Sequence, residues 1–106
     1  MAHYLVRAKV ITEKKDELKE RLDAGEIRPM RPFGTALDYS LRHARRDAAG
    51  WAVWEEEDYC RPPLAQERAA VLDEYFVDLQ VERVDKGQGW ARLEGLPSLW
   101  EEEQQD

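Results

Sequence analysis

Residues 3–11 read HYLVRAKVI and residues 76–84 read FVDLQVERV, and these two stretches decide the fold class. In the first, apolar residues at 4, 6, 8 and 10 alternate with other residues, broken only by Leu5. In the second, Val77, Leu79 and Val81 alternate with polar residues. A period of two residues predicts β-strands with one buried face. We therefore expect one strand early in the chain and one late.

The residues between these strands predict two helices and a hairpin. A helix is expected from Thr12 to Asp23, followed by Gly25 in the left-handed conformation that often ends a helix. Residues 35–46 show a two-residue period, 47–50 (DAAG) favour a turn, and WAVW at 51–54 starts another strand, so we expect a β-hairpin. A second helix is expected after Pro62 and Pro63, through Tyr75.

The resulting order, β-α-β-β-α-β, predicts an α+β fold of the ferredoxin-like type. Such a fold has a four-stranded antiparallel sheet with two helices on one face. Residues 1–85 would form this domain. Residues 86–106, which contain Trp90 and Trp100, would form an extension that packs on the domain or on a partner and has a solvated acidic end. The other sheet face would carry polar residues of the first and last strands, including Arg7, Lys9 and Asp78.

Composition excludes several classes of function. The 106 residues carry a net charge of −7, which disfavours nucleic-acid binding because that binding relies on Lys and Arg. Long apolar runs and a leader peptide are missing from the sequence, so we expect a cytoplasmic protein without membrane contact. One cysteine and two histidines are too few for a disulfide or a structural zinc site, and we expect no cofactor. The lack of asparagine fits a heat-adapted source.

The run EEEDYCR at 55–61 is the densest polar cluster. Glu55, Glu57 and Asp58 are candidate ligands for a divalent cation, with Cys60 as a candidate thiolate near a helix start. The alternative, which we favour, is that acidic residues simply stabilise the N-terminus of the following helix. We expect no metal site here.

A basic cluster lies between residues 28 and 46, where five arginines accompany one acidic residue, Asp38. These arginines either hold an anionic ligand or pair with the acidic third strand, since a turn at 48–49 would set Arg42 opposite Glu55. His43 would then be a candidate acid–base catalyst with these two residues as electrostatic partners. The candidate ligand-binding residues are Arg7, Arg28, Arg31 and Tyr39.

The predicted element order over residues 3–84 resembles that of the dimeric α+β barrel proteins, in which two ferredoxin-like sheets face each other around a cavity. The stretch AVWEEEDYCRPPLAQER at 52–68 also resembles a bacterial family of unassigned function. Members of the barrel group include isomerases, cofactor-free oxygenases and binding proteins, so the resemblance implies a pocket and no particular reaction.

Two functions therefore remain open from the sequence. The first is a homodimer that binds a small polar or anionic molecule in a cavity by the sheet. The second is a non-catalytic interaction module that uses the open sheet face and the Trp-containing tail.

Overall fold

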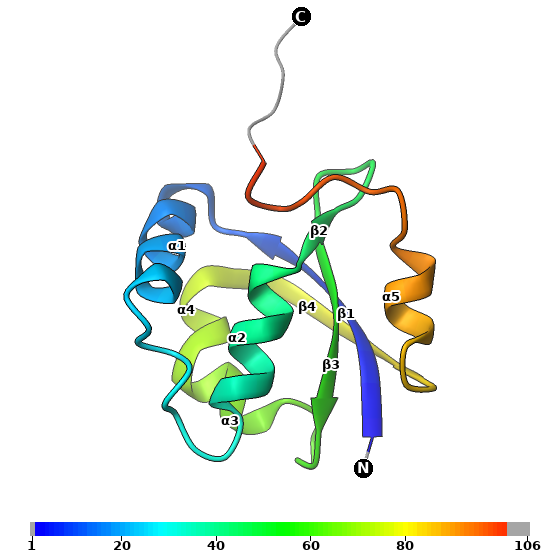
Figure 1. The fold of residues 1–106 in the computed structure, drawn as a ribbon, viewed down its shortest axis with the longest axis horizontal. Helices are drawn as coiled ribbons and strands as arrows, with labels where there is room; N and C mark the ends of the chain where they lie inside the picture. Colours follow the sequence, from blue (N-terminus) through cyan, green and yellow to red (C-terminus); the bar gives the residue numbers. More distant parts are fainter. Residues whose placement is uncertain (1, 102–106) are drawn as a thin grey trace, which may run out of the picture.

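The computed structural model describes residues 2–101 and is an α+β domain with one four-stranded antiparallel sheet (Figure 1). The strand order is β2-β3-β1-β4. The strands are β1 (Ala2–Val10), β2 (Arg45–Arg46), β3 (Ala52–Asp58) and β4 (Phe76–Val84). The acidic end at residues 102–106 lies outside the described residues. Within residues 2–101 there is no helix of the length and apolarity that crossing a membrane requires.

The first and last strands of the chain, β1 and β4, pair with each other, as expected. Residues 3–10 of β1 pair with residues 76–84 of β4, with one irregularity near Asp78, whose φ is +55°. β1 also pairs with β3, so it is the central strand. Val6, Ala8 and Trp54 point to one side and are fully buried, which confirms the predicted buried face.

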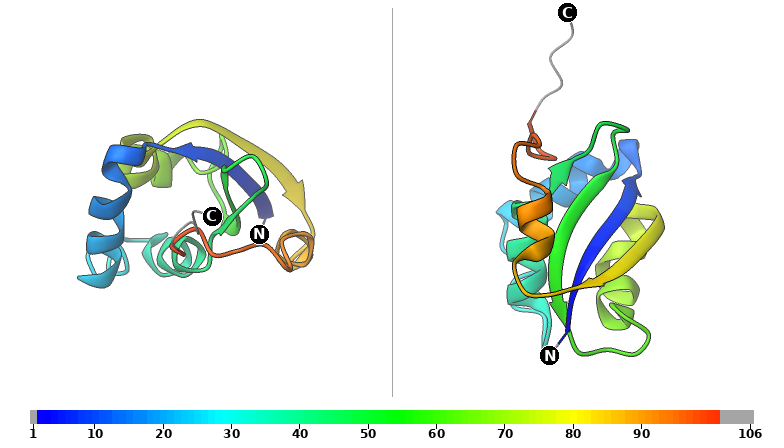
Figure 2. Two further views of the ribbon diagram at one scale, coloured as in Figure 1. Left: turned by 90° about the horizontal axis from the view of Figure 1, so that it is seen from above. Right: turned by 90° about the vertical axis from the view of Figure 1, so that its right-hand side faces the viewer.

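Two helical segments pack on that buried face. The first consists of η1 (Thr12–Lys14) and α1 (Lys15–Asp23), with Leu18 and Leu22 buried, as the sequence predicts. The second runs without a break through α3 (Ala65–Glu67), the π-helical turn η2 (Arg68–Leu72) and α4 (Asp73–Tyr75). We call it the 65–75 helix. Figure 2 shows both segments behind the sheet in its right-hand view.

The prediction of a long second strand at 35–46 is wrong. Residues Gly34–Arg42 form helix α2, and only Arg45–Arg46 remain as strand β2. The apolar residues Leu37 and Leu41 are four apart, so they share one face of a helix as well as one face of a strand. Ala44 completes this buried stripe. The element order is therefore not a plain βαββαβ.

A further helix lies on the opposite face of the sheet from the main core. α5 (Gln88–Arg92) packs near β3, and Figure 2 shows it in front of the sheet. The expectation of helices on one face only is therefore corrected. Beyond α5 the sheet face is polar: Arg7 binds Asp47 at 2.9 Å and lies over the ring of Trp51, and Lys9 pairs with Asp78 at 3.4 Å.

The segment after α5 folds back along the outer edge of β2. Leu99 N donates to Ala44 O, and Arg46 N donates to Pro97 O. The indole of Trp100 donates to Leu41 O at 2.7 Å. Residues 97–100 therefore cover the short edge strand and the end of α2, while the boundary between residues 85 and 86 stays a prediction.

Candidate functional site

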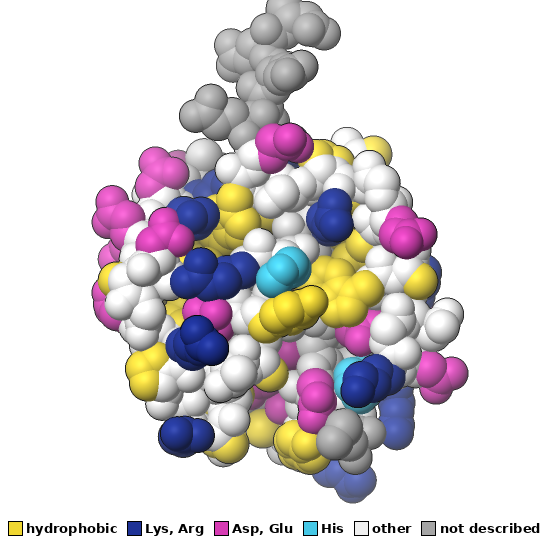
Figure 3. Space-filling view, viewed as in Figure 1, with side chains coloured by type: hydrophobic (Ala, Val, Ile, Leu, Met, Phe, Trp, Pro, Cys, Tyr) yellow, Lys and Arg dark blue, Asp and Glu magenta, His cyan; other side chains and the backbone are white. Residues whose placement is uncertain are grey.

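A cavity of 720 Å³ lies beside β3, between α2, α5 and the beginning of β1. Ligand pockets commonly enclose about 300–1,000 Å³, so this cavity has room for a small molecule. Its wall comes from segments far apart in the sequence, which meet only in the folded chain. They are the beginning of β1, residues 32–40, residues 55–60, Gln66, and residues 86–90. Figure 3 looks onto this side of the molecule and shows hydrophobic, acidic and histidine side chains gathered there.

Four aromatic side chains give the cavity its apolar lining: Phe33, Tyr39, Tyr59 and Trp90. Tyr39 of α2 and Trp90 of α5 meet edge to face, with ring centroids 6.3 Å apart. Tyr39 is 55% exposed and Tyr59 is 70% exposed. Large aromatic surfaces left in contact with water are available to stack on a ligand.

His3 and Glu57 lie together in the cavity wall. The two residues are directly opposite in the β1–β3 ladder, and His3 Nε2 is 3.8 Å from Glu57 Oε2. Tyr59 donates a hydrogen bond of 2.8 Å to the other oxygen of Glu57, and this bond raises the pKa of Tyr59. A histidine beside a carboxylate is a group that can accept or donate a proton near neutral pH.

Glu55 lines the cavity, but its carboxylate is held by backbone amides. Oε2 accepts a hydrogen bond from Gly87 N at 2.9 Å, and Oε1 accepts bonds from Gly89 N at 2.7 Å and Trp90 N at 3.3 Å. Because a carboxylate at a helix start satisfies amides that have no partner within the helix, Glu55 anchors α5 to β3. Ser40 fixes α2 to the same strand residue by donating to Glu55 O at 2.7 Å.

Behind the cavity wall, three carboxylates are buried between β3 and the 65–75 helix: Glu56, Asp58 and Glu67. Burial raises the pKa of Glu56 well above its ordinary value, and the neighbouring Glu67 raises it further. Burial also raises the pKa of Glu67 to about 7. For Asp58 burial acts in the same direction, but hydrogen bonds, above all from Leu64 N, keep its pKa below the ordinary value.

These shifts predict that the protein loses stability as pH rises towards neutrality. Glu67 has an ordinary pKa of 4.5 and a folded-state pKa of about 7, so between these values the folded chain holds more protons than the unfolded chain. The contribution of this group is therefore fully present below pH 4.5 and is lost as pH rises through 7. Urea denaturation from pH 4.5 to 8, with a chelator present, measures the effect, and Glu67→Gln should flatten the profile. Parallel profiles for the two proteins would contradict the assignment.

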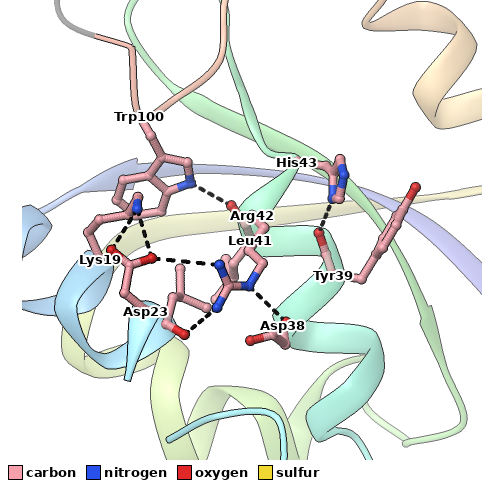
Figure 4. A network of polar contacts seen from close by, with 9 residues as sticks. Lys19, Asp23, Asp38, Tyr39, Leu41, Arg42, His43 and Trp100 are labelled. Carbon is pink, nitrogen blue, oxygen red and sulfur yellow. Dashed lines mark hydrogen bonds and ion pairs between the residues drawn. The ribbon is translucent and has the colours of Figure 1, made fainter. Parts of the chain in front are cut away.

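The structure does not bring Arg42, His43 and Glu55 together. Because residues 34–42 are helical, Arg42 lies on the far side of α2 from β3, where it pairs with Asp38 at 3.0 Å and Asp23 at 3.6 Å and donates to Leu22 O (Figure 4). His43 is exposed, stacks on Tyr39 with ring centroids 4.1 Å apart, and contacts Tyr39 O through Nδ1. Neither Arg42 nor His43 lines the cavity.

Of the four residues predicted to bind a ligand, only Tyr39 lines the cavity. Arg28 and Arg31 are exposed on the loop before α2. Arg7 lies on the polar sheet face with Asp47 and Trp51. The proposed cation ligands Glu55, Glu57 and Asp58 all reach the cavity wall, but Asp58 lies with Cys60 and Glu67, and Glu55 and Glu57 are not part of that group.

A second, smaller hollow of 470 Å³ lies at the other end of β1. Its wall includes Lys9, Lys15 and Arg46, together with Trp51. Both lysines and Arg46 are strongly basic side chains, so this hollow has the opposite charge character from the larger cavity.

The sequence reasoning did not single out Trp90, Tyr59 or Glu57 with His3 as partners in one site. The available signal was indirect: the two-residue period of β1 placed His3 at the end of a strand, and the tail contained an indole that needed burial. The actual partners depend on the β1–β3 register and on the position of α5, which have no local sequence signature.

Searches of protein-family models, curated proteins and solved structures gave no match to this chain.

Proposed function

We propose that this protein binds a small molecule in the 720 Å³ cavity, and that this molecule combines a flat apolar body with a hydrogen-bonding or cationic group. The observation that carries the proposal is the composition of the wall. Aromatic rings from α2, α5 and the loop after β3 surround a polar pair, His3 and Glu57. Pockets with a largely apolar lining and a few convergent polar groups are the usual form of a small-molecule site.

The charges in the wall favour a neutral or cationic ligand over an anionic one. Three carboxylates, Glu55, Glu57 and Asp58, line the cavity, against one lysine, Lys86, and His3. The arginines at 28, 31, 42, 45 and 46 are outside the wall. Exposed aromatic faces also attract cations, with Trp and Tyr the better partners. An anion is better matched by the basic hollow around Lys9, Lys15 and Arg46.

Acid–base chemistry at this cavity would use His3 as the proton carrier. Glu57 would orient its ring and stabilise the imidazolium form, as carboxylates do for catalytic histidines. The sequence-based candidate His43 is less suitable because its Nδ1 is engaged with Tyr39 O and its ring lies outside the cavity.

A thermal-shift screen of three matched sets of small aromatic compounds tests the binding proposal. Amines and neutral compounds should raise the melting temperature, while carboxylates of the same size should have less effect. A ligand present at 100 times its dissociation constant stabilises the fold by about 2.7 kcal/mol. Tyr39→Ala should abolish the shift, whereas Trp51→Ala, which removes an aromatic ring outside the cavity, should preserve it. Equal loss in both variants, or no stabilising compound, would contradict the proposal.

We also infer that the fold is a variant of the ferredoxin-like group. Support comes from the four antiparallel strands, the central position of β1 between β3 and β4, and the two helical segments on one face. The chain differs from the usual ferredoxin-like fold in two elements, helix α2 and the two-residue strand β2. A homodimer formed by opposed sheets, as in the dimeric barrel group, would be completed by the polar face around Arg7 and Lys9.

The alternative function, an interaction module, has one supporting observation. Val77 lies on the open side of β4 and is 47% exposed. Burial of such a side chain in a partner's sheet would explain its exposure. Sedimentation of the full chain and of Val77→Arg tests assembly through this face: a dimer that the substitution dissociates supports it, and a monomer in both cases argues against it.

A further inference from the structure

A group of potential metal ligands begins at one end of the cavity wall and continues into the interior behind it. Asp58, Cys60 and Glu67 each offer one donor atom, and these three atoms all lie within 4.8 Å of one another. Asp58 ends β3, Cys60 follows in the loop, and Glu67 reaches the same point from the 65–75 helix. Glu56 adjoins them, since it is two residues before Asp58 on the same side of β3.

Among the described residues, the buried carboxylate of Glu67 has only the neighbouring carboxyl groups of Glu56 and Asp58 as polar partners. The residue is fully buried, yet neither of its oxygens forms a hydrogen bond. Glu56 is 1% exposed and its Oε2 is also without a partner, while its Oε1 accepts only from the indole of Trp54 at 2.9 Å. A buried polar group without a partner is costly, and most such groups in native proteins meet a protein group, a water or an ion.

Positive charge is missing from this cluster. Among residues 2–101, no lysine or arginine forms an ion pair with Glu56, Asp58 or Glu67. Asp58 accepts a hydrogen bond from Leu64 N at 2.6 Å, but this neutral donor does not balance the negative charge of the three carboxylates. The three buried carboxylates, with the half-buried thiol of Cys60 beside them, therefore need either protons or a cation.

We propose that Asp58, Cys60 and Glu67 bind one divalent transition-metal ion of the zinc type, with Glu56 beside it. The choice of ion follows from the mixed donor set. A thiolate favours zinc and cobalt, whereas magnesium and calcium prefer oxygen ligands alone. Three protein ligands leave a fourth position in a tetrahedral site. Asp58 and Cys60 also line the cavity, so the ion can enter from there and water can complete its coordination.

This site differs from the one that the sequence offered as an alternative. That set consisted of Glu55, Glu57 and Asp58, and only Asp58 belongs to both. In the strand, Glu55 and Glu57 point away from Glu56 and Asp58, and both are engaged, with α5 amides and with Tyr59 respectively. Glu57→Gln is therefore a control variant on the same strand.

Titration of the chelator-treated, reduced full chain with Co²⁺, followed by Zn²⁺ competition against a chromophoric chelator, tests the site. We expect one ion per chain, a near-ultraviolet thiolate-to-cobalt absorption band, and a higher melting temperature with Zn²⁺. Glu67→Gln, which keeps the shape of the side chain, and Cys60→Ser should each weaken Zn²⁺ binding by more than about 100-fold, above the 10–100-fold that loss of an outer-shell partner causes. Glu57→Gln should bind as the wild type does.

Two results would overturn the site. One is the absence of stoichiometric Co²⁺ and Zn²⁺ binding, in which case the carboxylates are held by shared protons. The other is equal weakening in Glu57→Gln and Glu67→Gln, which would place the ion on the cavity side of β3. The titration needs no organic ligand, so its outcome is independent of whether the cavity binds a small molecule.

Discussion

Replacing Glu55 with alanine is expected to lower the free energy of unfolding by about 3 kcal/mol, because hydrogen bonds to charged groups contribute about 1.5–3 kcal/mol and the buried amide of Gly89 would lose its partner. The carboxylate is 4% exposed and accepts hydrogen bonds from the amides of Gly87, Gly89 and Trp90. Without it, α5 loses its attachment to β3, and the cavity loses the wall that carries Trp90. Urea denaturation measures the stability, and hydrogen exchange at the three amides reports the local effect.

Glu82→Ala is the matched control for this substitution. Glu82 also contacts α5, through a bond of 2.7 Å from Arg92, but this pair is on the surface. Exposed ion pairs contribute about 0–1 kcal/mol. If Glu55→Ala destabilises the protein no more than Glu82→Ala, the anchoring role of Glu55 is wrong.

Gly34→Ala is expected to destabilise the protein by about 3 kcal/mol, at the upper end of the usual cost of overpacking. A Cβ at this position would lie 2.5 Å from the carbonyl oxygens of both Ile27 and Arg28. These atoms belong to the backbone, so the loop or the beginning of α2 must move, and α2 carries the Tyr39 side of the cavity. Thermal and urea denaturation measure the loss.

Thr35→Ala is the control for the glycine substitution, because it changes the next residue of the same helix at an exposed position. Exposed substitutions of this kind usually change stability by no more than about 0.5 kcal/mol. Similar stability for Gly34→Ala and Thr35→Ala would show that the close approach of α2 to the 27–28 backbone is absent in solution.

The first, third and fourth strands and two of the helices could be predicted because their patterns are clear. The alternation in residues 3–11 favours a strand, and Leu18 and Leu22, four residues apart and followed by Gly25, favour a helix. Residues 35–46 were ambiguous, since Leu37 and Leu41 share a face in both structures. A two-residue period places Tyr39 on the same face as Leu37 and Leu41, whereas in α2 Tyr39 is turned outward and exposed. Tertiary packing against β3 decided between the two.

The error in α2 also explains why the predicted catalytic group did not assemble. The predicted hairpin placed Arg42 and His43 opposite the acidic strand. Residues 34–42 form a helix instead, so this strand pairing does not exist. The carboxylate run 55–58 was correctly assigned to a strand end, but a strand sends alternate side chains to opposite faces. Glu55 and Glu57 therefore meet the cavity, and Glu56 and Asp58 meet Glu67, whose position depends on the 65–75 helix and has no signal in the run itself.

Ligand binding in the cavity is tested most directly by an NMR titration with the best stabilising amine from the thermal-shift screen. Saturable amide shift changes are expected at residues 35–40, 57–60 and 86–90, together with changes in the imidazole signals of His3. Shift changes gathered instead around Lys9, Lys15 and Trp51, or spread along β4, would contradict it, because the ligand would then occupy the basic hollow or the open sheet face.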